Sequence, residues 1–310
     1  MAPFLYEEPG IWSFHRITII SVLIWLHKPM TFKPFRLLVG ILVLCNSALF
    51  GQEIGIGLRS LRNEFAKDPA AAMAQIHDMG FRQVELSDTY GLSFPQLIKL
   101  LAKNQLSVVS FGTTYEKLKA DPQAVADEAR SYGARFIVCN WLPHEGTFSP
   151  EDAETTSEVL NQAGKVISQN GLLLCYRPHG YEFTAHQSGT VFDYFMTKLD
   201  PSVVYLQMDI FWVKQAGKDP VALLRKYPSR FVMLHLNDRK HGSPVTSDGK
   251  ADPETNVSLG AGDAGVSEAV QVARELGIQY FFIEDESSRA SFQIPLSLAY
   301  LKGLAFQTRK

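Results

Sequence analysis

From residue 53 onward, short apolar runs alternate with longer stretches in which apolar residues recur at helical spacing. Such short runs, rich in Val, Ile, Leu and Phe, predict buried strands. Eight of them occur: IGIGLRS (54–60), FRQVELS (81–87), LSVVSFG (106–112), RFIVCNW (135–141), LLLCYR (172–177), VYLQMD (204–209), FVMLHL (231–236) and YFFIED (280–285). Eight strand–helix units in about 250 residues predict a (β/α)8 barrel, the TIM barrel fold.

The helical stretches carry start and stop signals. A capping side chain followed by proline opens four of them, at Asp68-Pro69, Asp121-Pro122, Ser149-Pro150 and Asp219-Pro220. Glycine closes four before the next strand, at Gly80, Gly133, Gly171 and Gly277. No linker divides residues 52–310, so we expect one catalytic domain there. An open doubly wound sheet is the alternative, but IGIGLRS lacks its GxGxxG signature. The glycine-rich LGAGDAG (259–265) follows no strand run and is predicted to be a flexible active-site loop.

Residues 1–51 differ from the rest and predict a leader with a signal peptide. Lys33 and Arg36 follow Met30, and a long uncharged apolar run leads to Gly51, after which we expect cleavage. Met30 is then the expected true start. We therefore expect an exported, periplasmic protein without stable membrane insertion after processing. The alternative is a membrane anchor formed by an uncleaved leader.

The charge of the chain limits the class of partner, and the positions of its cysteines indicate their state. The chain has 30 basic and 32 acidic residues, a formal charge of −2, which argues against nucleic acid as a partner. Cys139 and Cys175 both lie in strand runs, so we expect two core thiols rather than a disulfide. A small molecule is the expected partner.

Several predicted strands end on a charged or metal-binding residue. Arg177, Asp209, His235 and Glu284 each follow about four residues suited to burial, and His179 comes two residues after Arg177. Because the carboxyl ends of barrel strands meet at one mouth, we expect these side chains to lie at one height. An Asp, a His and a Glu that converge suit a divalent metal ion such as Mn, Mg, Co or Zn.

At this point the chain resembles the sugar phosphate isomerase/epimerase family, the xylose isomerase-like TIM barrels that also include endonuclease IV and are known as AP endonuclease family 2. The resemblance covers roughly residues 54–305, and its motifs include SLRNEF (60–65), MGFRQVELSDTYGLS (79–93), CYRPHGYEF (175–183), HLNDRK (235–240), GAGD (260–263) and FFIEDE (281–286). It implies a divalent metal held by residues from strands five to eight. The last three ligands carry over to Asp209, His235 and Glu284.

The first family ligand does not carry over, because Arg177 stands where relatives have histidine or glutamate. A guanidinium stays protonated and has no lone pair for a metal. Three outcomes are open: His179 supplies the fourth ligand, Arg177 replaces the charge of the metal, or the site is degenerate. Our leading hypothesis has three protein ligands, water completing the shell, and Arg177 facing the substrate.

The resemblance implies a metal-dependent isomerase or epimerase that removes a proton next to the carbonyl of a keto-sugar. We expect Glu284 to bridge metal and substrate, and His179 or Glu182 to act as acid and base. Expulsion of a leaving group after proton removal would instead make the protein a lyase or dehydratase. Five side chains are predicted to contact the sugar: Arg177, Trp141, Trp212, Lys240 and Glu85.

Two hypotheses from other classes compete with this one. A DNA-repair nuclease of the endonuclease IV type would need further metal-binding histidines where the strands offer Glu85, Ser110 and Trp212. A non-catalytic sugar-binding barrel would have kept the fold and lost the metal, and Arg177 is the residue that favours it.

Overall fold

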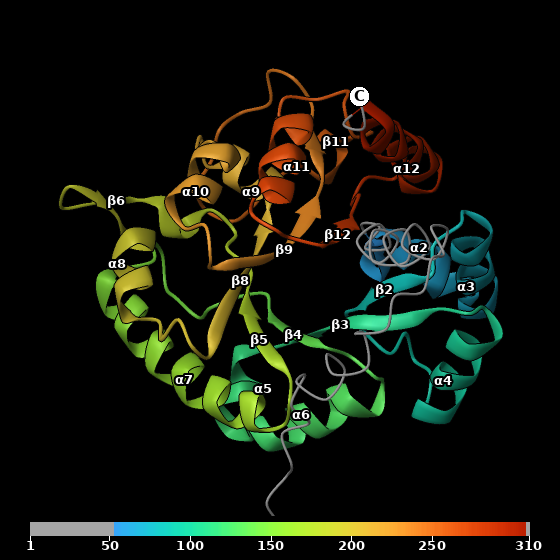
Figure 1. Ribbon diagram of the computed structural model, residues 1–310, viewed down its shortest axis with the longest axis horizontal. Helices are drawn as coiled ribbons and strands as arrows, with labels where there is room; N and C mark the ends of the chain where they lie inside the picture. The colour runs from blue at the N-terminus through green and yellow to red at the C-terminus, as the bar shows by residue number, and fades with distance from the viewer. Residues whose placement is uncertain (1–52, 308–310) are drawn as a thin grey trace, which may run out of the picture. The chain divides into compact units, whose positions relative to one another are not determined.

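The barrel predicted from the sequence is closed and has eight parallel strands (Figure 1). The structure is a computed structural model and describes residues 53–307. Its barrel strands are β1 (Glu53–Gly57), β2 (Gln83–Leu86), β3 (Ser107–Thr113), β4 (Phe136–Cys139), β5 (Leu173–Tyr176), β8 (Val204–Asp209), β9 (Phe231–Leu236) and β12 (Tyr280–Ile283). Each strand pairs with the strands before and after it in this order, and β12 closes the ring on β1. All eight predicted strand runs are confirmed.

Helices surround the strands and form the outer layer of a single (β/α)8 domain (Figure 1). They are α2 (Arg62–Lys67), α3 (Pro69–Asp78), α4 (Phe94–Lys103), α5 (Tyr115–Ala120), α6 (Pro122–Ser131), α7 (Pro150–Gln169), α8 (Val191–Lys198), α9 (Ile210–Gln215), α10 (Pro220–Lys226), α11 (Val266–Glu275) and α12 (Ala290–Gln307). The predicted caps are present: Asp68, for example, accepts hydrogen bonds from the amides of Ala70 and Ala71. The predicted stop Gly80 has a φ of 98°, in the left-handed region that glycine favours.

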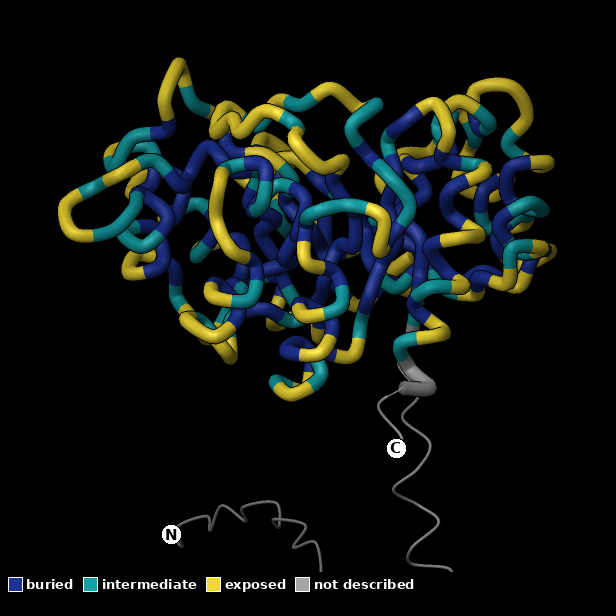
Figure 2. The backbone as a smooth tube through the Cα atoms, turned by 90° about the horizontal axis from the view of Figure 1, so that it is seen from above, coloured by how far each residue is buried: buried dark blue, intermediate teal, exposed yellow. Residues whose placement is uncertain are grey.

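The interior of the barrel is built in layers, and this places the polar strand ends. Five side chains form a small apolar cluster inside the ring: Phe136, Val138, Cys175, Met233 and Phe282. Side chains two residues apart on a strand point to the same face. The next inward positions after Cys175, Met233 and Phe282 are therefore Arg177, His235 and Glu284. The apolar layer thus forms the floor beneath a polar layer. Figure 2 shows that buried residues gather in the middle of the molecule and exposed ones at its edges.

Two further predictions concern the cysteines and the N-terminal leader. Cys139 and Cys175 are buried and free, as expected for core thiols. The leader and the signal peptide lie outside the described residues. Within residues 53–307, no helix is long and apolar enough to cross a membrane.

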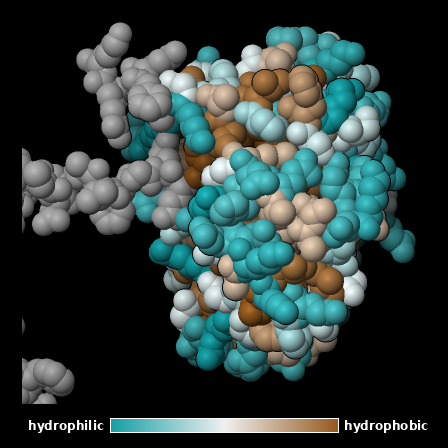
Figure 3. All heavy atoms as spheres, turned by 90° about the vertical axis from the view of Figure 1, so that its right-hand side faces the viewer, coloured by the Kyte–Doolittle hydropathy of each residue, from teal (hydrophilic) through white to brown (hydrophobic). Residues whose placement is uncertain are grey.

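On the face bearing α3, α4 and α12, hydrophilic residues alternate with smaller hydrophobic areas (Figure 3).

Close packing of α7 against the chain before β8 depends on Gly164. A Cβ atom at this position would lie 2.5 Å from the carbonyl oxygen of Val203. Gly164→Ala is therefore expected to lower the free energy of unfolding by about 1–3 kcal/mol, measured by urea denaturation. Gly303→Ala is the matched control: nothing lies within 4 Å of its added Cβ in α12. Because alanine favours a helix, the control should gain roughly 0.5–1 kcal/mol. Equal stability of the two variants would contradict the packing of α7.

Candidate active site

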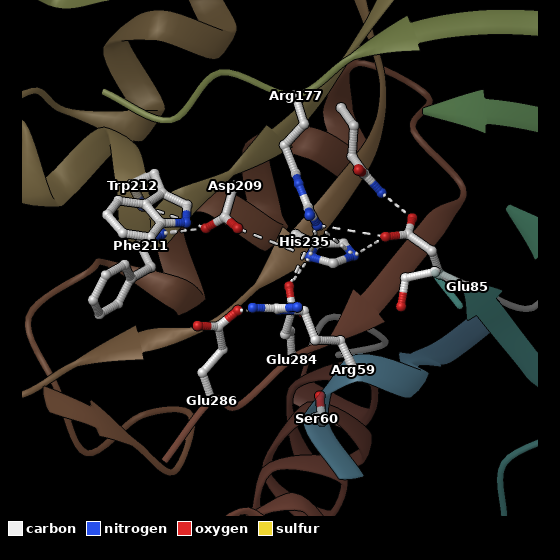
Figure 4. Close-up of polar contacts among 12 residues, drawn as sticks. Arg59, Ser60, Glu85, Arg177, Asp209, Phe211, Trp212, His235, Glu284 and Glu286 are labelled. Atoms are coloured by element: carbon white, nitrogen blue, oxygen red, sulfur yellow. Dashed lines mark hydrogen bonds and ion pairs between the residues drawn. The ribbon is translucent and has the colours of Figure 1, made fainter. Parts of the chain in front are cut away.

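A cavity of about 450 Å³ opens at the carboxyl ends of the strands. Six of the predicted site residues line it: Glu85, Trp141, Arg177, His179, Trp212 and Glu284. Asp209 and His235 lie buried next to it, with exposed fractions of 1% and 0%. The structure therefore brings residues from β2, β5, β8, β9 and β12 together at one height, as the strand ends predicted. Figure 4 shows five of these side chains pointing toward one another.

His235 is the centre of this polar cluster. Its Nδ1 lies 2.6 Å from Oε2 of Glu284, and its Nε2 lies 3.0 Å from Oε1 of Glu85 (Figure 4). Carboxylates only accept, so each ring nitrogen is placed to donate to the carboxylate it faces, although the donor Nη1 of Arg177 also lies 2.7 Å from Nδ1. Burial alone would lower the pKa of His235, but the charges of Glu85 and Glu284 outweigh it and raise that pKa to about 10.

Glu85 is held in place by neighbours that the sequence did not single out. Its Oε2 accepts hydrogen bonds of 2.7 Å from the hydroxyl of Ser110 and of 2.7 Å from the side-chain amide of Gln207. Burial alone would raise the pKa of Glu85, but the charges of His235 and Arg177 hold it well below its ordinary value. Gln207 had a usable signal: it lies two residues before Asp209, on the same face of β8.

Asp209 divides its two oxygens between two environments. Oδ1 caps α9 by accepting from the amides of Phe211 and Trp212, at 3.1 and 3.3 Å. Oδ2 is buried and has no hydrogen-bond partner among the described residues, and it lies 3.8 Å from Nδ1 of His235. Burial raises the pKa of Asp209 to about 7. An unpartnered buried oxygen of this kind is open to a cation.

Asp209, His235 and Glu284 form a possible metal site, because each offers one ligand atom and these atoms lie within 4.8 Å of one another. The donor set is chemically suited to a divalent ion. The guanidinium of Arg177, however, already lies between these ligand atoms. Nη1 of Arg177 lies 2.7 Å from Nδ1 of His235 and 3.3 Å from Oε2 of Glu284. With Arg177 in this position, Asp209, His235 and Glu284 do not have room for a metal ion in addition.

His179 lies on the wall of the cavity between two tryptophans. Its Nδ1 is 2.9 Å from the carbonyl oxygen of Arg177, so this nitrogen carries the proton and Nε2 is left as an acceptor. Burial and the charge of Arg177 lower the pKa of His179 to about 3. Its ring centroid lies 5.7 Å from that of Trp141 and 5.5 Å from that of Trp212. Trp141 is 41% exposed and lines the cavity, while His144 stacks on its ring with the centroids 5.2 Å apart.

Glu182, predicted as a catalytic acid or base, is not among the residues that line the cavity. It is fully buried and accepts from the amides of His179 and Gly180 and from the hydroxyl of Tyr176. Burial raises the pKa of Glu182 to about 7, against these hydrogen bonds. The geometry therefore gives Glu182 a positioning role: it holds the backbone loop that carries His179.

Two further predictions about loops need correction. Lys240 is exposed and does not line the cavity, so the structure does not bring it to the site. The glycine-rich loop at 259–265 is not a flexible active-site loop, since Asp238 fixes it by accepting from the amides of Gly260, Gly262 and Ala264. A different segment, 249–251, lines the cavity instead. It follows no strand run, so no local pattern marks it.

An ion pair on the cavity wall was also missed. Arg59 follows β1, and its Nε lies 2.9 Å from Oε1 of Glu286 (Figure 4). Both residues line the cavity together with Lys250. Arg59 lies in the short 3-10 helix Leu58–Leu61 that follows β1, so the two-residue period of a strand does not place its side chain.

The fold and the site together define a TIM barrel with a charged cluster at the mouth of the strands. The model of the xylose isomerase-like TIM barrel family matches residues 73–309, and the chain belongs to that enzyme family. Inosose dehydratase from Clostridium beijerinckii is 28% identical over 187 residues, which make up 54% of this chain and 62% of that protein. The chain thus matches about six tenths of the length of this curated relative.

Solved structures show the same fold at low sequence identity. A sugar phosphate isomerase/epimerase from Parabacteroides distasonis has a TM-score of 0.68 and 23% identity, over 81% of this chain and 98% of that one. A xylose isomerase-like barrel protein from Mycobacterium smegmatis, in complex with magnesium, has a TM-score of 0.64 and 17% identity, over 82% and 96%. The IOLI protein with a bound zinc atom has a TM-score of 0.63 and 14% identity, over 82% and 97%.

Proposed function

We propose that the protein is an enzyme that removes a proton from the carbon next to the carbonyl of a keto-sugar or a related cyclic polyol ketone. One observation supports this most: two carboxylates lie on either side of His235, with Arg177 beside them, at the floor of a polar cavity. Such an arrangement pairs bases with positive charges placed where negative charge develops in the transition state.

The residues divide the reaction between them. Glu284 lines the cavity and takes the proton from carbon, while the electron pair moves to the carbonyl oxygen. Arg177 faces the resulting enolate oxygen and stabilises its charge, and His235 keeps Glu284 ionised and oriented. The Nε2 atom of His179 accepts a hydrogen bond from a substrate hydroxyl. A divalent ion at Asp209, His235 and Glu284 would require Arg177 to leave, and no step above depends on one.

The fate of the enolate separates the candidate activities. Return of the proton to the other face gives an epimer, and its return to the neighbouring carbon gives an isomer. In a dehydratase, Glu284 passes the proton to a departing hydroxide and water is released. Isomerase or epimerase activity is the first expectation from the family. The dehydratase is the second candidate, and the 28% identity to an inosose dehydratase favours it.

The substrate class follows from the walls of the cavity. Trp141 and Trp212 offer aromatic faces for the apolar face of a sugar ring, and Arg59, Lys250 and Glu286 offer hydrogen bonds to hydroxyls. The nuclease hypothesis lacks support, because the strand positions that would supply extra metal ligands carry Glu85, Ser110 and Trp212. Export from the cytoplasm stays part of the proposal and rests on the leader sequence alone.

Solvent deuterium exchange tests the proposal directly. The purified protein is incubated with keto-sugars and with an inosose in heavy water, and the products are followed by NMR. We expect deuterium at the carbon next to the carbonyl, with loss of water if the enzyme is a dehydratase. Glu284→Gln should abolish the exchange, and Lys240→Ala should leave it unchanged because Lys240 does not line the cavity. Ligand binding without exchange or product would favour the non-catalytic barrel instead.

A further inference from the structure

The guanidinium of Arg177 makes its contacts inside the cluster through one nitrogen. Nη1 lies 2.7 Å from Nδ1 of His235, 3.3 Å from Oε2 of Glu284 and 3.4 Å from Oε1 of Glu85. The residue is only 6% exposed, although it reaches the cavity wall. This nitrogen therefore lies among the same atoms that would ligate a metal ion.

A metal ion and this nitrogen compete for one position. A divalent ion binds an imidazole nitrogen at about 2.0–2.2 Å along the single in-plane lone pair of that nitrogen. On His235, the Nδ1 atom already has Glu284 at 2.6 Å and Arg177 at 2.7 Å. An ion inserted here would also meet a guanidinium that cannot lose its proton. Nη1 of Arg177 and a bound ion would need the same place next to Nδ1 of His235.

The backbone of Arg177 is held at the end of β5, while its side chain lines the cavity. Its backbone amide is fixed at the end of β5 by a 3.1 Å hydrogen bond to the carbonyl oxygen of Cys139. On the opposite side, a Cβ atom added at Gly57 would lie 3.4 Å from Cε1 of His235 and 3.6 Å from Oε1 of Glu284. An added Cβ would thus make only ordinary van der Waals contacts, so β1 lies about one side-chain atom away from His235 and Glu284.

From this geometry we propose that Arg177 is the resident cation of the site and that the protein functions without a divalent metal ion at Asp209, His235 and Glu284. The role of the guanidinium in holding an enolate rests on the proposed function. The statement about metal binding does not, because it depends only on the positions of the four side chains. A covalently attached cation also differs from a metal in that a chelator cannot remove it.

Metal binding by the wild-type protein is the first test. The protein is loaded separately with Mn²⁺, Zn²⁺ and Mg²⁺, dialysed, and examined for metal content and melting temperature. We expect far less than one equivalent of bound metal and no shift in melting temperature, since an ion that binds only the folded state would raise it. One equivalent of tightly held metal that is lost in Asp209→Asn would overturn the proposal.

Variants at Arg177 supply the complementary test. Arg177→His removes the fixed charge and adds a nitrogen ligand, so it should bind Zn²⁺ at least about 100-fold more tightly than the wild type does. Arg177→Gln removes the charge alone and serves if the histidine variant does not fold. Arg59→Gln is the matched control, because Arg59 lines the cavity but pairs with Glu286 outside the cluster. A folded Arg177 variant with no gain in zinc affinity would count against the proposal.

The outcomes separate this proposal from the proposed function. If the wild-type protein binds metal and catalyses exchange, the proposal that Arg177 replaces the metal is refuted, while the proposed enzymatic function stands. Metal-free protein that catalyses no exchange on any keto-sugar or inosose would refute the proposed reaction and leave Arg177 as the cation. Exchange that persists in the presence of EDTA would support both.

Discussion

Replacing His235 by glutamine is expected to lower the rate of the proposed proton exchange by about 100- to 10,000-fold. His235 donates to Glu284 at 2.6 Å and to Glu85 at 3.0 Å, and it carries positive charge between them. Glutamine has one amide group, which cannot donate in both directions at these distances, and it is neutral. Glu284 would then lose both its orientation and the charge that keeps it ionised. The exchange rate measured by NMR, beside the circular dichroism spectrum of each variant, tests this expectation.

His241→Gln provides the control for the effect of a histidine-to-glutamine change. His241 is exposed, lies outside the cavity, and should be replaced without loss of exchange. If His235→Gln were folded and still exchanged the substrate proton at the wild-type rate, the cluster around His235 would not be the site of the reaction.

The inward-facing layer could be predicted because it follows from the period of a strand. Asp209, His235 and Glu284 each come after a buried run, and parallel strands bring their carboxyl ends to one mouth. The same period places Gln207 and Asp209 on one face of β8. Residue type and spacing therefore determined which side chains meet, without knowledge of how far each one reaches.

The position of Arg177 could not be predicted in the same way. The sequence places its Cα at the end of β5, but its long side chain can reach either the substrate or the neighbouring strands. Its direction is decided by three carboxylates that come from β2, β8 and β12, and these meet only in the folded barrel. The prediction that Arg177 faces the substrate therefore missed the distance of 2.7 Å between its Nη1 and Nδ1 of His235.

A carboxylate in a loop was the other source of error. Glu182 follows β5 and was predicted as an acid or base, whereas Asp238, which follows β9, was given no role. In the folded protein both accept hydrogen bonds from backbone amides, which a loop must satisfy wherever it is buried. A carboxylate within two to four residues of glycines is as well suited to hold a loop as to catalyse a reaction.

Asp238→Ala is accordingly expected to lower the free energy of unfolding by about 3–5 kcal/mol. The side chain is 2% exposed and accepts from four amides, those of Arg239, Gly260, Gly262 and Ala264, at 2.9 to 3.0 Å. Alanine would leave these donors without their acceptor in a buried loop. The loop cannot easily close over the gap, because the backbone at Gly262 already approaches the carbonyl oxygen of Arg239 too closely for a side chain.

Asp219→Ala distinguishes this role from ordinary helix capping. Asp219 is exposed and caps α10 by accepting from the single amide of Val221 at 2.9 Å, so its loss should lower the free energy of unfolding by only about 1 kcal/mol. Urea denaturation of both variants gives the comparison. Equal losses would mean that the loop at 259–265 is held by something other than Asp238. A larger loss in Asp238→Ala, with proton exchange retained at low temperature, would establish that this carboxylate acts on the fold and not on the reaction.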